Sequence, residues 1–427
     1  MKGLWGRKSL SLKFDEHVNF LTGLNGSGKT TVINLIAATL GADFATLDRI
    51  SFESIDIEVV DPQKRTNRSN IIVQKRRNQK SEFLSIEYEI SGSSKSDNYR
   101  FSVDSLPEQL MLRESMTYQR DARNLYVRQR LSRGSETVLE KLRQQINLTW
   151  LSIHRMQANR NAREERDRGY ESPVDQRLYH LSNELVRYFS SLAIRADAET
   201  NKFQRFVFLS LLGRESPSEL VESVQRLDLA QERNTLTAIF KTFQLSEPEF
   251  QPDLEGHLKI AKAAIASVQK QKTLTFPQWI GLINLWRSHS VVQQWHALDE
   301  RQQVIYEPKV TFLSVLNGMI GQKRFSISEK NELAVELDDG TPLPLTGLSS
   351  GEKQLLIILG EALLQERQRW VYIADEPELS LHVSWQEQLI PHLKKINPSA
   401  QVVFATHSPD IVSVFRQNVF DVGALLK

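Results

Sequence analysis

Cysteine is absent from the 427-residue sequence, and long hydrophobic runs are absent as well. The lack of cysteine excludes disulfide bonds, cysteine-ligated zinc and thiol catalysis. Apolar runs such as Leu355–Ile358 are far too short to cross a bilayer. The first residues, Met1–Trp5, soon give way to polar ones, so the pattern of a signal peptide is missing. We therefore expect a cytoplasmic protein in a reducing compartment.

The sequence also lacks a strong excess of charge of either sign. It has 54 basic and 52 acidic residues and a net charge of +2. Any affinity for nucleic acid must then come from local patches. Hydrophobic residues make up 40% of the chain and charged residues 25%, which is typical of a globular protein. The length allows one large core and an inserted domain.

Both ends of the sequence alternate strands and helices, as in an α/β fold with a parallel sheet, whereas the middle is mostly helical. We predict an α/β domain in two parts, residues 1–105 and 321–427, interrupted by a mainly helical insertion at 106–320. Within the insertion, the apolar stretch 148–156 is a candidate strand that returns to the core. Predicted strands include 18–21, 55–60, 70–74, 84–90 and 98–103, and a turn at Asp338–Gly340 separates two later strands.

The helical middle shows no sustained heptad, so we expect a compact helical lobe, alone or with a short coiled hairpin, rather than a long coiled coil. The helical stretches predicted from periodicity are 136–147, 175–193, 200–212, 217–243, 256–271 and 277–298.

A glycine-rich segment, Gly23–Thr30, lies between a short apolar strand and an apolar helix and fits G-x-x-x-x-G-K-[ST]. Its glycines let consecutive N–H groups point at one phosphate chain, and the helix adds its positive N-terminal dipole. Lys29 is predicted to reach the β- and γ-phosphates and Thr30 to ligate Mg²⁺. The predicted nucleotide-binding residues are Asn25, Gly26, Ser27, Gly28, Lys29, Thr30 and Thr31.

Two acids, Asp375 and Glu376, follow directly after the apolar strand Trp370–Ala374. Strand ends of a parallel sheet form its ligand-binding edge. An aspartate there can coordinate Mg²⁺ beside the phosphate loop. The adjacent glutamate can polarise a water molecule aimed at the γ-phosphate. We predict Asp375 and Thr30 as metal ligands and Glu376 as a catalytic residue.

Two further motifs lie near the C-terminal end. Ser349, Ser350 and Gly351 precede an apolar helix, and a helix N-terminus with hydroxyls and little bulk can receive an anion. His407 follows the apolar strand Gln401–Ala405, where its imidazole can hydrogen-bond a γ-phosphate.

Together, in this order, these four elements resemble the ABC-ATPase family. The resemblance covers about 1–100 and 325–427. It implies an ABC-type P-loop nucleotide-binding domain, a mixed sheet with helices on both faces, carrying a large helical insertion. It also implies ATP and Mg²⁺ as ligands, His407 as the switch histidine and dimerisation around ATP. In such dimers Ser349, with Ser350 and Gly351, acts in trans on the partner's nucleotide, and Glu378–His382 joins the two sites.

The spelling of the motifs indicates a branch of this family. Ser-Ser-Gly-Glu at 349–352, Asp-Glu-Pro-Glu-Leu-Ser-Leu-His at 375–382 and Ala-Thr-His-Ser-Pro at 405–409 resemble the OLD-type and RecF/SMC-like ATPases. Within these, the chain resembles the stand-alone ATPase subunits of the PARIS and Septu anti-phage systems. We favour PARIS, although no residue separates the two. Gln157 is the candidate for the glutamine loop, and no aromatic residue is assigned to the adenine base.

Two clusters of basic residues lie outside these motifs. The first, on a predicted hairpin, could contact DNA phosphates, tRNA or an acidic protein, or be an ordinary solvated surface. The second lies in the helical region and is equally open. The first cluster comprises Lys64, Arg65, Arg68, Lys75, Arg76, Arg77 and Lys80, and the second Arg120, Arg123, Arg128, Arg130 and Arg133.

Two functions follow from the sequence. The first is a sensor and scaffold for anti-phage defence that responds to a trigger such as a phage protein and controls a separate effector, which the resemblance implies to be a nuclease. The alternative is a RecF/SMC-like DNA-repair or DNA-clamp ATPase. A transporter subunit is disfavoured by the spelling at 349–352 and by the large helical middle. After His407 only Asp410 and Asp421 are acidic, which cannot form a metal-dependent nuclease site, so we expect a second polypeptide to carry the effector chemistry.

Overall fold

The computed structural model describes residues 1–61, 68–77, 84–92, 98–104, 136–151, 172–212, 227–270, 273–413 and 415–427. The chain divides into two compact units. The first consists of Met1–Val186 and Thr311–Lys427, and the second of Arg187–Val310. The second unit is thus shorter than the insertion predicted at 106–320. Among the helices that these ranges contain, none is both long and apolar enough to cross a membrane.

A five-stranded sheet forms the centre of the first unit, in the order β12-β1-β11-β10-β6. All four of its strand pairs are parallel. Its inner strands are nearly continuous apolar runs because both faces of a parallel sheet are covered. Within β11, for example, Val402, Val403 and Phe404 are all buried. The strands span β1 (Val18–Thr22), β6 (Leu148–Leu151), β10 (Val371–Asp375), β11 (Gln401–Ala405) and β12 (Val419–Asp421).

Of the stretch predicted at 148–156, residues 148–151 form β6 and pair with β10, and the rest lies outside the described residues. Two buried helices accompany the sheet: α1 (Lys29–Leu40) and α11 (Ser350–Leu364). Both are apolar on nearly all sides, as expected for helices inside a large core. Residues 136–145 are also helical, within the stretch predicted at 136–147. Other described helices of this part are α2 (Phe44–Arg49), α12 (Val383–Ile396), α13 (Pro409–Val412) and α14 (Val422–Leu425), with short 3-10 turns η2 (Leu345–Gly347) and η3 (Arg416–Asn418).

A second, antiparallel sheet has the order β2-β3-β4-β5. Its side chains alternate strictly: Ile71, Val73 and Tyr88 are buried, whereas Asp56 and Glu58 are exposed. This alternation is what a sheet with one covered face requires, and it confirms the predicted strands. The strands span β2 (Ser54–Val60), β3 (Arg68–Arg77), β4 (Leu84–Ser91) and β5 (Tyr99–Asp104).

A third sheet, β7-β8-β9, contains the predicted turn at Asp338–Gly340. Gly340 has φ +82°, a conformation that favours glycine. The strands span β7 (Lys323–Ile327), β8 (Leu333–Leu337) and β9 (Pro342–Leu343). The α/β fold class is therefore confirmed, with parallel and antiparallel strands in separate sheets.

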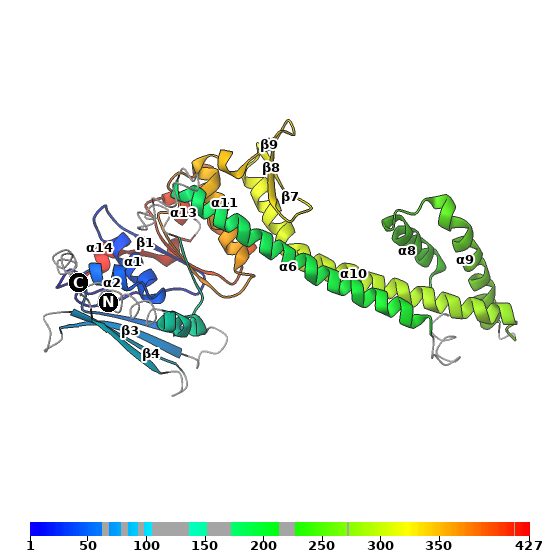
Figure 1. Cartoon of the computed structure of the whole chain (residues 1–427), viewed down its shortest axis with the longest axis horizontal. Coiled ribbons are helices and arrows are strands. Elements are labelled where there is room, and N and C mark those ends of the chain that lie inside the picture. Colours follow the sequence, from blue (N-terminus) through cyan, green and yellow to red (C-terminus); the bar gives the residue numbers. More distant parts are fainter. Residues whose placement is uncertain are drawn as a thin grey trace, which may run out of the picture. The chain divides into compact units, whose positions relative to one another are not determined.

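The helices of the middle region are longer than predicted. Helix α6 (Pro173–Ser210) joins the predicted stretches 175–193 and 200–212, and α10 (Phe276–Met319) extends well beyond 298. They run side by side in the second unit, where Arg301 lies 3.2 Å from Glu199 (Figure 1). The prediction of separate helices at 175–193 and 200–212, and of a helix ending at 298, was wrong. The buried residues of α6 include Leu178, Leu181, Leu185, Tyr188 and Leu192, a spacing of three and four that makes a heptad.

Two other helices lie in the described part of the second unit. Helix α9 (Glu247–Gln269) starts with a capping box between Ser246 and Glu249. Helix α8 (Leu229–Thr242) packs against it through Leu236, Ile239 and Phe250.

Candidate active site

The glycine-rich segment Gly23–Thr30 connects β1 to α1 as predicted. Gly23, Gly26 and Gly28 have φ of +138°, +81° and +96°, values that residues with a side chain rarely adopt. Gly28 is the N-cap of α1, and no side chain caps this end. The first N–H groups of α1 therefore remain available to bind a phosphate chain, supported by the helix dipole.

The side chain of Lys29 folds back over this loop. Its Nζ donates to the carbonyl oxygens of Gly23, at 2.9 Å, and Leu24, at 3.2 Å, and the residue is 5% exposed. The ammonium group is thus held inside the curve of the loop. A point charge in this position is suited to β- and γ-phosphates.

The predicted metal ligands Thr30 and Asp375 come together, although 345 residues separate them. The hydroxyl of Thr30 lies 3.3 Å from Oδ1 of Asp375. The sheet order causes this, because β1 and β10 flank β11 and all three end at the same edge. One hydroxyl and one carboxylate oxygen are the hard ligands that Mg²⁺ prefers, so these residues fit a magnesium ion.

The two predicted catalytic residues also meet at this edge. Nε2 of His407 lies 3.6 Å from a carboxylate oxygen of Glu376. Glu376 has φ +49°, and its N–H donates to the carbonyl oxygen of Ala405 at 2.7 Å. A left-handed backbone at a non-glycine residue costs about 1–2 kcal/mol and is typical of functional sites. Here it turns the chain away from β10 so that Glu376 faces the end of β11.

The predicted signature residues begin α11. Ser349 is its N-cap, and Glu352 completes a capping box by accepting from the N–H of Ser349 at 2.7 Å. Ser349 and Ser350 are exposed, whereas Gly351 is buried against the carbonyl oxygen of Ser380, where a side chain would clash. The exposed hydroxyls are therefore presented at a rigid helix N-terminus.

Ion pairs fix this helix to the beginning of α6, within the first unit. Lys353 lies 2.7 Å from Asp175, and Arg177 pairs with Glu361. Burial alone would raise the pKa of Asp175, but hydrogen bonds from Lys353 and Ser172 outweigh it and hold the pKa below its usual value. Burial raises the pKa of Glu361, despite Arg177.

Two contacts near the site, made by Trp5 and Glu378, could not be predicted from the sequence. The ring of Trp5 lies against Gly28, where a side chain at Gly28 would overlap it. Glu378 is buried and accepts hydrogen bonds from the residues that follow β11. Trp5 belongs to no local motif, and Glu378 lies in the motif at 375–382 without a predicted role of its own; tertiary structure brings both to the site. The candidate glutamine-loop residue, Gln157, lies outside the described residues.

The basic segment between 64 and 80 is described only in part, and its described side chains are engaged. Lys75 donates to the carbonyl oxygens of Asp48 and Ile50, both at 2.8 Å, and burial lowers its pKa. Arg76 lies 3.4 Å from Glu87. These contacts favour the reading of an ordinary solvated sheet over that of a nucleic-acid site. Arg120 and the rest of the second cluster lie outside the described residues.

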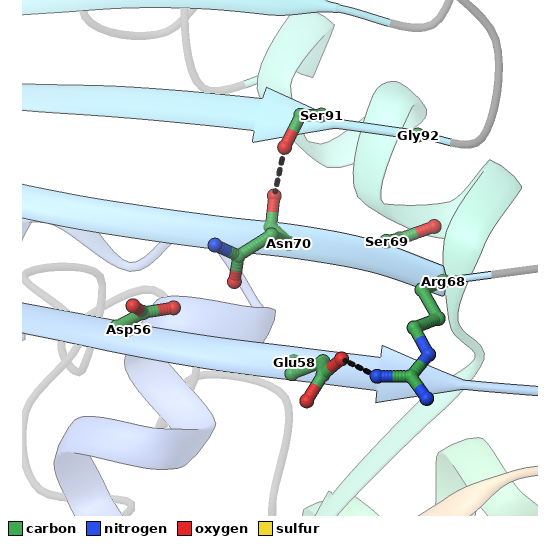
Figure 2. A pocket seen from close by; sticks show the side chains of 7 residues that line it. All are labelled: Asp56, Glu58, Arg68, Ser69, Asn70, Ser91 and Gly92. Atoms are coloured by element: carbon green, nitrogen blue, oxygen red, sulfur yellow. Dashed lines mark hydrogen bonds and ion pairs between the residues drawn. The ribbon is translucent and has the colours of Figure 1, made fainter.

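A cavity of about 260 Å³ lies on the polar face of the antiparallel sheet (Figure 2). Arg68 crosses one side of it and donates to Glu58 at 2.9 Å. It is built from β2, β3 and the end of β4, not from the phosphate loop or the strand ends that carry Asp375 and His407. Its lining residues are Asp56, Glu58, Arg68, Ser69, Asn70, Ser91 and Gly92. We assign it no role.

Known proteins share this arrangement in sequence. The family model described as "AAA domain, putative AbiEii toxin, Type IV TA system" matches residues 18–413. The match begins at β1 and ends beyond His407, so it includes every predicted site residue.

Two curated proteins match shorter stretches. One, "Retron Vc95 probable ATPase" of Vibrio cholerae serotype O1 biovar El Tor, is 28% identical over 127 residues, 27% of this chain and 24% of that protein. The other, "Retron Ec83 probable ATPase" of Escherichia coli, is 31% identical over 90 residues, 18% of this chain and 17% of that protein. The chain thus matches at most about a quarter of the length of these relatives.

Solved structures with a similar course of the chain include archaeal Smc heads. The Smc head domain with an extended coiled coil from Pyrococcus furiosus, bound to the C-terminal domain of ScpA, has a TM-score of 0.37 at 13% identity. That alignment covers 96% of this chain and 89% of that one. A Smc head domain with a coiled coil and joint from Pyrococcus yayanosii has a TM-score of 0.32 at 13% identity and covers 96% and 92%. Scores this low support no further conclusion.

Proposed function

We propose that two copies of this chain share two ATP sites. The premise is that the chain belongs to the family described as "AAA domain, putative AbiEii toxin, Type IV TA system" and is therefore a P-loop ATPase. The observation that carries the proposal is the meeting of four predicted residues at one sheet edge. Thr30 lies beside Asp375, and Glu376 lies beside His407. This is the set of groups that hydrolysis of a γ-phosphate needs.

Each residue of the candidate site has a distinct task in this proposal. The N–H groups at the start of α1 and Lys29 hold the phosphate chain. Thr30 and Asp375 hold Mg²⁺, which neutralises charge on the phosphates. Glu376 orients a water molecule and takes its proton, since a carboxylate can serve as general base. His407 donates a hydrogen bond to the γ-phosphate and, at 3.6 Å from Glu376, keeps that carboxylate directed at the water.

The exposed surface around the site favours a second copy of the chain as the partner that covers the open side of the nucleotide. Leu24 on the phosphate loop is 86% exposed, Leu379 is 42% exposed and Val383 is 58% exposed. Apolar side chains beside a polar site are typical of a surface that another chain covers. Ser349–Gly351 of the second copy would supply the helix N-terminus that contacts the γ-phosphate from the opposite side.

Trp5 is our candidate for the contact with the adenine base, because its ring lies against Gly28 and is 46% exposed. We expect Trp5→Ala to weaken ATP binding by about 1–3 kcal/mol, roughly 5- to 150-fold, the usual value of one base on one aromatic ring. Isothermal titration of ATP into the Trp5→Ala chain and into the unchanged chain, both with Lys29 intact, measures this affinity. Trp150→Phe, a change in the core strand β6, is the control and should leave the affinity unchanged. Equal affinities for Trp5→Ala and the unchanged chain would show that the base lies elsewhere.

For the biological role we propose a sensor and scaffold in anti-phage defence. The support is the family description, with its toxin–antitoxin context, and the likeness to two retron ATPases. ATP would hold the copies together while they retain an effector protein, such as a nuclease, until a phage protein triggers release. A PARIS-like arrangement remains our preference over a Septu-like one, on the sequence resemblance alone.

The test is to produce the chain with and without the product of its neighbouring gene. We expect the two proteins to co-purify, and toxicity to require both. The lone chain should degrade neither DNA nor RNA. If the lone chain instead shows ATP turnover that DNA stimulates, and substitution of Arg68 and Arg76 abolishes the stimulation, the DNA-clamp alternative is correct. If the lone chain is itself a nuclease, the scaffold proposal fails.

A further inference from the structure

Glu378 is a buried acid whose hydrogen bonds join two strand ends. It follows β10 by three residues and is 6% exposed. One of its oxygens, Oε1, accepts from the hydroxyl of Thr406 at 2.5 Å, the N–H of His407 at 3.0 Å and the N–H of Ser408 at 3.3 Å. All three donors follow β11. The carboxylate of Glu378 therefore holds the backbone at His407 next to the turn that contains Glu376.

The same short loop is held from a second direction. Gln354, on the signature helix α11, donates to the carbonyl oxygen of Pro377 at 2.6 Å. Pro377 lies between Glu376, whose left-handed backbone starts the turn, and Glu378. The position of Glu376 is thus set by the N–H that it donates to Ala405, and that of His407 by the oxygen of Glu378.

Packing alone does not account for a carboxylate here. Its second oxygen, Oε2, is buried and has no partner among the described residues. A buried acceptor without a donor reduces stability. The amino-terminal edge of the same sheet is tied by neutral groups instead: Asn397 donates to Gln365 at 2.7 Å, and Gln365 donates to Thr149 at 3.0 Å. At the edge that carries the site, the acceptor of three donors is instead a carboxylate.

We propose that Glu378 is a positioning residue for ATP hydrolysis that sets His407 against Glu376. A carboxylate oxygen can accept from three donors. The amide oxygen of a glutamine at the same place is a weaker acceptor. Losing it frees the backbone at His407, so the imidazole no longer keeps its place 3.6 Å from the carboxylate of Glu376. The inference rests on the proposed function, because it assumes the roles given above to Glu376 and His407.

Two variants of the full chain test the proposal. Glu378→Gln keeps the shape of the side chain, and we expect kcat to fall roughly 10- to 100-fold, the usual cost of misplacing a catalytic group. Thr406→Val removes one donor and should lower kcat severalfold. Binding of a fluorescent ATP analogue should change by less than about twofold in both, because the phosphate loop is intact. The matched control is Thr149→Val, a buried threonine in the same sheet, which should keep the unchanged kcat.

The same variants in a His407→Ala chain show whether Glu378 acts through His407. We expect Glu378→Gln to have almost no further effect there, because coupled residues are not additive. Its full effect in that chain would overturn the proposal, as would an unchanged kcat for Glu378→Gln and Thr406→Val while Glu376→Gln is inactive. If Glu378→Gln does not fold, Thr406→Val decides by the same criteria. An unchanged kcat in Glu376→Gln would instead refute the role that the proposed function gives to Glu376.

Discussion

Replacement of Glu376 by glutamine is expected to preserve ATP binding and to reduce hydrolysis by about a hundredfold or more. An amide can donate or accept a hydrogen bond but cannot take a proton from water, and a general base contributes about 10²–10⁴-fold. The phosphate loop does not include Glu376, so the affinity for ATP should not fall. The measurements are the release of phosphate and the binding of a fluorescent ATP analogue by the same purified chain.

Two comparisons make this result specific. Lys29→Ala should lose ATP binding as well as hydrolysis, because Lys29 supplies the charge held inside the loop. Glu387→Gln, an exposed acid on α12, should keep both activities. Hydrolysis by Glu376→Gln at the rate of the unchanged chain would show that another group is the base.

The second large effect is expected at Ser349, which lies outside the phosphate loop. Ser349→Arg places a long cation at the exposed start of α11, where the proposal puts the partner's γ-phosphate. ATP binding should remain and hydrolysis should be lost. Loss of the N-cap itself costs only about 1 kcal/mol. Ser246→Arg, which removes a similar capping box from α9, is the matched control and should hydrolyse ATP normally.

The meeting of the candidate site residues at one sheet edge could be predicted from the sequence, because each lies in a short motif next to a recognisable strand or helix. Three apolar strands, ending at Thr22, Asp375 and Ala405, had to be neighbours for the motifs to meet. Their continuous hydrophobicity predicted a covered parallel sheet. In such a sheet the carboxyl ends lie at one edge. The structure confirms this by the contact between Thr30 and Asp375.

Other residues could not be predicted, because their roles depend on distant parts of the chain. Glu378 is one acid among several after β10, and only the fold brings it to Thr406. Lys75 has the composition of a basic patch, yet the sheet's alternation turns it inward toward Asp48 and Ile50. Trp5 reaches Gly28 from a turn in which Trp5 itself has φ +51°, and no local pattern indicates this conformation.

The length of α6 was underestimated for a different reason. The sequence was divided between residues 193 and 200, around Asp197 and Thr200. Neither residue breaks a helix, and both are tolerated on a long helix that is stabilised by packing rather than propensity. The heptad through Leu181, Leu185 and Leu192 carried the better signal.

The central claim is that each ATP site is shared between two chains, and mixing two inactive variants tests it most directly. Lys29→Ala has no working phosphate loop but a normal α11, and Ser349→Arg has the reverse. Each should be inactive alone. Mixed dimers, verified by two affinity tags, should regain hydrolysis at about one competent site per dimer. Mixed dimers that remain as inactive as either variant would contradict shared sites and with them this account of the chain.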